Sequence, residues 1–196
     1  MRLYVAVVAL LVAGADVALA QTAGARAGAA TAKPSAGAGP VIVVDTIKGS
    51  FEFETYPSEA PKTVEHILAL VRRNFYNGQR VHRVVPGFVM QFGDPLTRDM
   101  RKQADWGGGG SNKPVGVLET SPKHTHVVGA VALAHLSGNP GSGDSQMYVV
   151  LAPQPQLNKD FTVFGKVISG MDVVQKLRVP DIIKRVSVKG ETKPRS

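Results

Sequence analysis

Short β-type runs dominate the chain from residue 41 onward, and they restrict its possible folds more than any other feature. Val41–Ile47 is rich in β-branched residues and Phe51–Glu54 alternates apolar with polar residues, so both are predicted strands. Six further strands are expected, over Arg80–Val84, Phe88–Phe92, Val127–Ala134, Gln146–Leu151, Thr162–Ile168 and Ile182–Val188. Strands this short and this close together favour an antiparallel barrel or sandwich over a parallel sheet with crossover helices.

Two segments have a helical pattern instead. Ser58 is placed to cap a helix with Pro61 in its first turn, and Met171–Leu177 predicts a second, shorter helix. Apolar residues recur at helical spacing in the first segment, at Val64, Ile67, Leu68 and Val71. Helices that do not alternate with strands would cover the open ends of a barrel. The pattern therefore predicts a mainly β fold, an antiparallel barrel or sandwich with two helices. Residues 93–125 show no clear periodicity, and Gly107–Gly110 with Ser111-Asn112 predict an irregular loop.

The first 40 residues differ in composition from the rest. Arg2, the uncharged run Leu3–Ala15 and the small residues of Ala18-Leu19-Ala20 predict a cleavable signal peptide over 1–20. Asp16 interrupts this run before the ~20 apolar residues of a membrane span. Residues 21–40 are rich in Ala and Gly and predict a flexible linker, followed by a folded domain over 41–189 and a disordered tail over 190–196.

This organisation predicts a periplasmic protein with no stable membrane insertion after signal cleavage. Secretion, or anchoring through an uncleaved signal, is the alternative.

Composition excludes several kinds of chemistry. The 196 residues include no Cys, which rules out disulfides, a Cys-ligated zinc site and a thiol nucleophile. His124 and His126 are two residues apart, but two ligands are too few for a metal, and we expect solvated loop histidines. No metal and no cofactor are predicted. The net charge of +8 comes without a basic stripe interleaved with aromatic residues, so no nucleic acid partner is expected.

Residues 81–93 contain the densest group of chemically versatile side chains. Alternation along a strand places Arg83 on the face opposite His82. A turn then presents Phe88, and Gln91 follows on the returning strand. An arginine, an aromatic ring and an amide can therefore project from two neighbouring strands toward one surface. By itself the same pattern also fits a hairpin with a solvated arginine and a core phenylalanine.

Two later segments complete a pattern that resembles the cyclophilins, the peptidyl-prolyl cis-trans isomerases. These segments are Gly129–Leu151, which contains Ser145-Gln146, and Gln156–Val167, which ends in Val163-Phe164-Gly165-Lys166-Val167. Together with His82-Arg83, Pro86-Gly87-Phe88, Gln91 and Gly93-Asp94 they occur in family order, and the resemblance spans about Val41 to Val188. The compact loops look more like the bacterial exported branch. The resemblance implies a mainly β fold, a closed eight-stranded antiparallel β-barrel capped by two α-helices.

The resemblance also assigns roles by position. Arg83 matches the family's catalytic arginine, with Phe88 and Gln91 beside it. The implied substrate-binding residues are Val89, Tyr148, Leu157 and Phe161 for the proline pocket, and Ala134, His135 and Gln146 for the groove that receives the residues before proline. His135 stands where an Asn is usual, and Phe161 where a His is common. Gln156 stands where many members have a Trp that supports cyclosporin binding, so we expect weak cyclosporin binding.

These residue types suit rotation about an X–Pro bond. The reaction makes and breaks no covalent bond, so it needs no nucleophile, base or metal. Twisting the amide leaves a lone pair on the prolyl nitrogen, and a guanidinium aimed at that nitrogen binds the twisted state better than either planar isomer. The sequence thus predicts a monomeric isomerase that assists folding of unfolded or partly folded, proline-containing exported proteins. A non-catalytic chaperone or assembly module that binds proline segments in the same groove is the alternative.

Overall fold

The computed structural model describes residues 38–191, so the predicted signal peptide, most of the linker and most of the tail lie outside the described residues. The strands are β1 Val41–Thr46, β2 Gly49–Thr55, β3 Arg83–Val85, β4 Val89–Phe92, β5 Ala130–Leu133, β6 Met147–Val150, β7 Val163–Ser169 and β8 Ile183–Val188. The α-helices are α1 Pro61–Arg72 and α2 Met171–Lys176. Short 3₁₀ helices span Pro95–Arg98, Met100–Asp105, Pro140–Ser142 and Pro155–Leu157. The first two lie within residues 93–125, where the sequence shows no clear periodicity. In this part of the chain, no helix has the length and apolar character needed to cross a bilayer.

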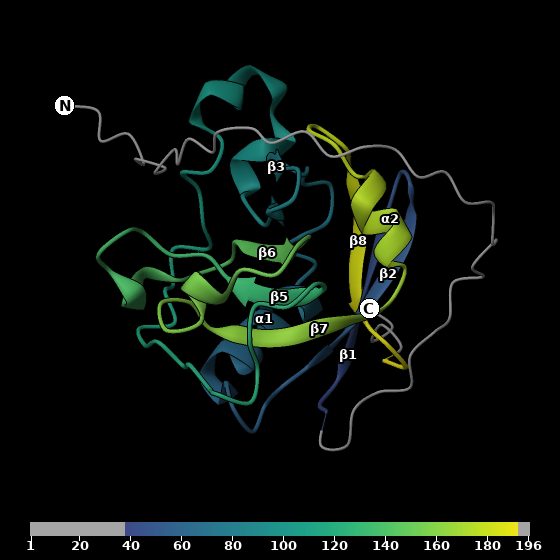
Figure 1. Ribbon diagram of the computed structural model, residues 1–196. Coiled ribbons are helices and arrows are strands. Elements are labelled where there is room, and N and C mark those ends of the chain that lie inside the picture. The colour runs from purple at the N-terminus through teal and green to yellow at the C-terminus, as the bar shows by residue number, and fades with distance from the viewer. Residues whose placement is uncertain (1–37, 192–196) are drawn as a thin grey trace, which may run out of the picture.

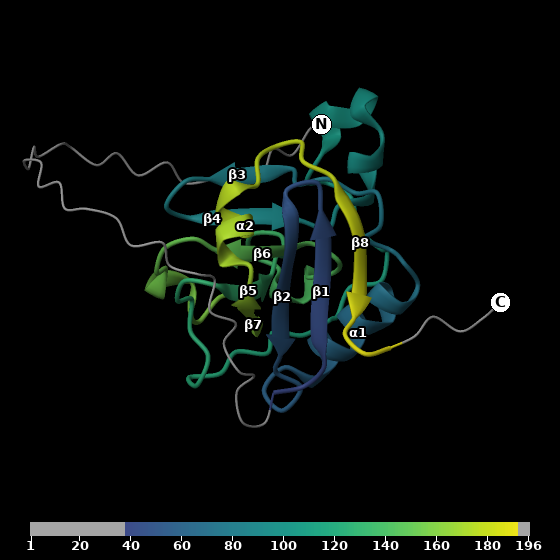
Figure 2. The same cartoon turned by 90° about the vertical axis from the view of Figure 1, so that its right-hand side faces the viewer.

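All eight strands form one antiparallel sheet in the order β3-β4-β6-β5-β7-β2-β1-β8. In Figure 1, β5, β6 and β7 lie across the direction of β1, β2 and β8, so the sheet curls on itself. Figure 2 looks toward β1, β2 and β8 and shows the other five strands following one another in sheet order.

The predicted closed barrel is found only in part. Within the described residues the edge strands β3 and β8 are not paired with each other, and the edges meet at a single bridge between Arg80 and Ile182. Backbone hydrogen bonds flank this bridge, including one of 2.9 Å from the Val81 N–H to the Asp181 carbonyl. The predicted strand over Arg80–Val84 is therefore divided, because its first residues pair with the far edge while β3 pairs with β4. The result is a curled half-barrel.

One apolar core fills the inside of the curl. Inward-facing residues of the sheet such as Phe51, Phe53 and Phe92 are fully buried, and Phe51 meets Phe92 edge to face at 6.4 Å between ring centroids. The helices contribute Val64, Ile67, Leu68, Leu70 and Val71 from α1 and Val174 from α2 to the same core. Full burial of one such side chain stabilises the fold by about 1.5–3 kcal/mol. Both helices therefore belong to the core that supports the sheet.

The start of α1 is capped from a distant part of the chain. The N-cap residue is Ala60, which makes no side-chain cap, so the predicted cap by Ser58 is wrong. Instead, the Glu119 carboxylate accepts hydrogen bonds from the backbone N–H groups of Lys62 at 3.1 Å and Thr63 at 2.9 Å. A negative charge at this end also interacts favourably with the helix dipole.

Two histidines occupy shielded positions. His126 is 1% exposed, so the prediction of a solvated loop histidine is wrong for this residue. Burial lowers the pKa of His126, against the opposing effect of its hydrogen bond with Asn158. Both ring nitrogens of His82 are shielded from solvent. Burial lowers the pKa of His82 as well, with Asp94 opposing the shift.

Replacing Glu119 with Ala should lower the free energy of unfolding by about 1–2 kcal/mol, because two helix N–H groups lose their acceptor and the helix dipole loses a charge. Urea unfolding followed by circular dichroism measures the change. The matched control is Ser58→Ala, at an exposed position, which should cost less than about 0.5 kcal/mol. A larger loss in S58A than in E119A would contradict the assignment of the cap.

The free energy of unfolding should fall as the pH is lowered from about 7 to 5.5. A histidine whose pKa is depressed in the folded state takes up a proton on unfolding, so stability present above its unfolded pKa of ~6.5 is lost as pH falls toward the folded value. Urea titrations at several pH values measure this slope. The double variant H82Q/H126Q should show a shallower slope, and an equal or steeper one would refute the role of these two residues.

Candidate active site

A row of directly opposed residues crosses the outer face of the curled sheet. Arg83 on β3 pairs with Gln91 on β4, and Gln91 lies opposite Tyr148 on β6. Tyr148 lies opposite Ala132 on β5, which in turn lies opposite Val163 on β7. Since successive residues of a strand point to opposite faces, the side chains of this row all point away from the core.

The same face carries a second apolar cluster, which we call the outer cluster. It contains the buried residues Tyr56, Val89, Ala130, Ala132, Tyr148, Val150 and Val163, with the partly buried Phe88, Ala134, Leu157 and Phe161 packed against them. Phe161 meets Tyr148 edge to face at 5.9 Å between centroids. The outer cluster thus unites all five predicted pocket and aromatic residues, Phe88, Val89, Tyr148, Leu157 and Phe161, with the predicted groove residue Ala134.

Arg83 lies beside this cluster. Its Cζ is 5.4 Å from the centroid of the Phe88 ring, and its Nη1 donates to Gln91 Oε1 at 3.4 Å. Burial lowers the pKa of Arg83, with Tyr148 opposing the shift, yet an arginine stays charged throughout the physiological range. Among the described residues this is the one hydrogen bond of the guanidinium, so its other N–H groups can meet a substrate.

A chain of amide hydrogen bonds continues from Gln91. Its Nε2 donates to Gln146 Oε1 at 2.9 Å. Gln146 Nε2 donates in turn to the backbone carbonyls of Gly107 at 2.9 Å and Gly109 at 2.8 Å. Because carbonyls only accept, these bonds orient both amides, and Gln91 Oε1 is left facing Arg83. The predicted groove residue Gln146 therefore orients the predicted catalytic residue Gln91.

Asp94 fixes the glycine segment at the end of this series of hydrogen bonds. Sequence reasoning missed this role. Its fully buried carboxylate accepts backbone hydrogen bonds from Leu96 at 2.7 Å, from Gly107 and from Gly109 at 3.3 Å. A Cβ at position 109 would collide with this carboxylate, so glycine is required there. The available signal was the Gly93-Asp94 pair directly after a strand, followed by the run Gly107–Gly110.

His135 connects the predicted groove with the predicted pocket. Its ring stacks on Phe161 at 4.3 Å between centroids, and its Nε2 is 2.6 Å from the Asp160 carbonyl. Through this contact the last of the ten predicted site residues joins the patch formed by the others. Gln156 is exposed, and its Nε2 donates to Gln154 Oε1 at 2.6 Å.

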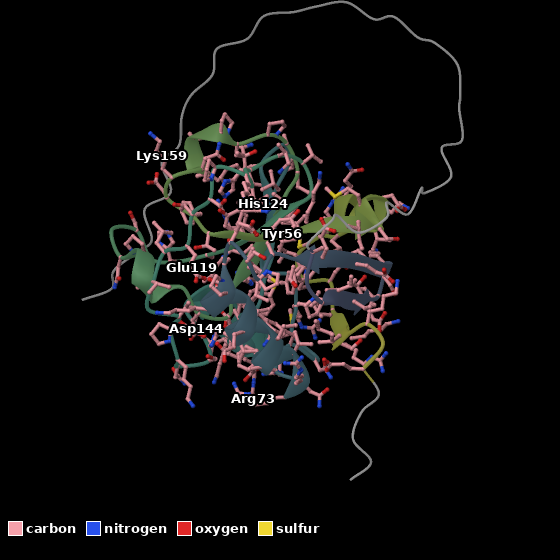
Figure 3. The ribbon with its side chains drawn as sticks, turned by 90° about the horizontal axis from the view of Figure 1, so that it is seen from below. Tyr56, Arg73, Glu119, His124, Asp144 and Lys159 are labelled. Atoms are coloured by element: carbon pink, nitrogen blue, oxygen red, sulfur yellow. The ribbon has the colours of Figure 1, made fainter. Side chains whose placement is uncertain are left out.

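The side chains of His124 and His126 contact different residues. His124 stacks on Tyr56 at 3.6 Å between centroids, and these two side chains lie close together in Figure 3. The His124 ring is also 3.6 Å from the Glu59 carboxylate, whereas His126 contacts Tyr148 and Asn158. Over residues 38–191, no group of three or more acidic or histidine side chains is arranged to hold a metal ion.

Known proteins are similar to this chain in sequence. The profile of the family described as cyclophilin type peptidyl-prolyl cis-trans isomerase/CLD matches residues 41–196. Peptidyl-prolyl cis-trans isomerase B of Bacillus subtilis (strain 168) is 40% identical over 139 residues, which cover 71% of this chain and 90% of that protein. A probable peptidyl-prolyl cis-trans isomerase of Brucella abortus (strain 2308) is 39% identical over 166 residues, covering 78% and 84%.

Solved structures share the fold. A crystal structure of a cyclophilin type peptidyl-prolyl cis-trans isomerase of Cryptosporidium parvum has a TM-score of 0.68 at 24% identity, covering 78% of this chain and 99% of that one. A second structure of that protein, in the presence of the dipeptide Ala-Pro, has a TM-score of 0.67 at 25% identity, covering 77% and 99%. On the match of its whole folded domain, the chain belongs to the cyclophilin family of peptidyl-prolyl cis-trans isomerases.

Proposed function

We propose that this cyclophilin isomerises X–Pro bonds with Arg83, Phe88 and Gln91, and that it binds the proline ring on the outer cluster. The observation that carries the proposal is the row from Arg83 through Gln91 to Tyr148 beside that cluster. A proline ring packed there would bring its imide nitrogen within reach of the guanidinium. The Ala-Pro dipeptide in the Cryptosporidium parvum structure supports proline-containing peptides as the substrate class.

The barrier to X–Pro rotation is consistent with catalysis by a positively charged side chain held in place. The rotation barrier of an X–Pro bond is ~18–20 kcal/mol, and unaided isomerisation takes tens to hundreds of seconds. A typical turnover of ~10²–10³ s⁻¹ requires an acceleration of ~10⁴–10⁵, or ~5.5–7 kcal/mol off the barrier. Arg83 contributes to this by interacting with the nitrogen lone pair that exists only in the twisted state, in a partly desolvated place where electrostatic interactions are stronger.

Gln91 holds the substrate backbone in this scheme. One hydrogen of its Nε2 is used by Gln146, and the second is available to a substrate carbonyl next to the X–Pro bond. The ring fixed on the outer cluster leaves the carbonyl side of the bond to rotate. His135 and Gln146 line the neighbouring groove for the residues before proline.

Replacing Arg83 with Ala should reduce kcat/KM for an Ala-Pro peptide about 10²–10³-fold, because the twisted state loses its cation. Arg83→Lys should restore little, since an ammonium lacks the directional donors of a guanidinium. NMR exchange spectroscopy on the peptide measures the rate directly. Arg73→Ala, at the end of α1 (Figure 3), is the matched control and should keep the wild-type rate. An R83A variant that is folded and fully active would refute the assignment.

We further propose that residues 1–20 direct export to the periplasm, where the monomeric enzyme acts on unfolded or partly folded proteins. The positive Arg2, the apolar run Leu3–Ala15 and the small residues of Ala18-Leu19-Ala20 support this proposal. On expression in a Gram-negative bacterium, the mature protein should begin at Gln21 and should be recovered in the periplasmic fraction. N-terminal sequencing tests this. An intact N-terminus in the cytoplasm would disprove export, and one in the membrane fraction would show an uncleaved anchor.

A further inference from the structure

We propose that His126 is a positioning residue of the isomerase, which holds the Tyr148 hydroxyl from within the protein and so shapes the pocket for the substrate proline. The inference rests on the proposed binding of proline at the outer cluster. His126 is outside the set of site residues that the sequence predicts.

His126 connects three parts of the pocket wall. Its Nε2 lies 3.0 Å from the hydroxyl of Tyr148 on β6, and its Nδ1 lies 3.0 Å from Asn158 Oδ1. Asn158 directly follows Leu157, so this hydrogen bond connects the segment that carries Leu157 to His126. The ring also meets Phe161 edge to face at 6.5 Å between centroids. One imidazole therefore contacts or adjoins three of the predicted proline-pocket residues.

The hydrogen bonds define where the protons are. The backbone N–H of His126 donates to Asn158 Oδ1 at 2.8 Å, which identifies that atom as the acceptor. The Nδ1 facing the same oxygen must then carry a hydrogen. In a neutral ring Nε2 is left with a lone pair, which accepts the O–H of Tyr148. The lowering of the His126 pKa by burial agrees with a neutral ring.

The Tyr148 hydroxyl depends on this acceptor. Tyr148 is 5% exposed, and within residues 38–191 its hydroxyl has no hydrogen-bond partner other than His126. Without the imidazole, a buried hydroxyl would be left unsatisfied and the ring would have to move toward water. Such a movement disturbs the edge contact with Phe161 and the row that continues to Gln91. The effect on catalysis is therefore transmitted through Tyr148.

A double-mutant cycle separates this role from general packing. His126→Leu should raise KM for an Ala-Pro peptide at least about tenfold, with a smaller change in kcat, because the proline pocket is misshapen while Arg83 stays in place. Tyr148→Phe removes the hydroxyl that needs an acceptor. In the Y148F background, the additional change in KM caused by H126L should fall below about threefold. The matched control is His124→Leu, which should leave KM within about twofold of wild type.

Equal losses on H126L in both backgrounds would overturn the proposal, because a merely structural role does not depend on the Tyr148 hydroxyl. An unchanged KM in H126L would overturn it too. Long-range ¹H–¹⁵N NMR of the wild-type imidazole adds a readout independent of activity: the expected tautomer carries its hydrogen on Nδ1, and a hydrogen on Nε2 would contradict the inferred bond to Tyr148. Failure of the proposed catalytic site would show separately, as full activity in R83A.

Discussion

The pairing of β3 with β4, and of β4 with β6, is the constraint on which the site depends. Strand residues alternate between faces, so the register that places Arg83 opposite Gln91 and Gln91 opposite Tyr148 also sends Met90 and Phe92 into the core. A slip of one residue would exchange the two faces. The apolar core therefore holds Arg83 in position as well as stabilising the fold.

Behind Arg83, a chain of hydrogen bonds runs from the buried Asp94 to the partly buried amides of Gln146 and Gln91. Asp94 fixes the backbone at Gly107 and Gly109, that backbone orients Gln146, and Gln146 orients Gln91. Leaving the buried Asp94 carboxylate without its backbone donors would cost about 1–3 kcal/mol, and the amide hydrogen bonds restrict the orientation of Gln146 and Gln91. Groups set in place before the reaction need no reorganisation as the amide twists, which is the main benefit of electrostatic preorganisation.

The pocket of this chain differs from the most familiar cyclophilin pattern in a coordinated way. Of the three positions that depart from this pattern, His135 and Phe161 stack on each other, so these two departures form one contact rather than two separate changes. Phe161 also adjoins Tyr148 and His126. Four neighbouring rings, those of His126, His135, Tyr148 and Phe161, therefore pack together at the proposed proline pocket.

Local patterns in the sequence predicted the strands (apart from the divided segment Arg80–Val84), the apolar face of α1 and the division of the 81–93 segment between two faces. They could do so because periodicity along the chain determines which side chains can share a surface. The family motif also gave ten candidate site residues, which the structure brings to one face of the sheet. The Glu119 cap, the loop held by Asp94, the burial of His126 and the single bridge that joins the sheet edges were decided by tertiary structure. Each depends on which distant segments meet and exclude water, and neither spacing nor composition encodes that proximity.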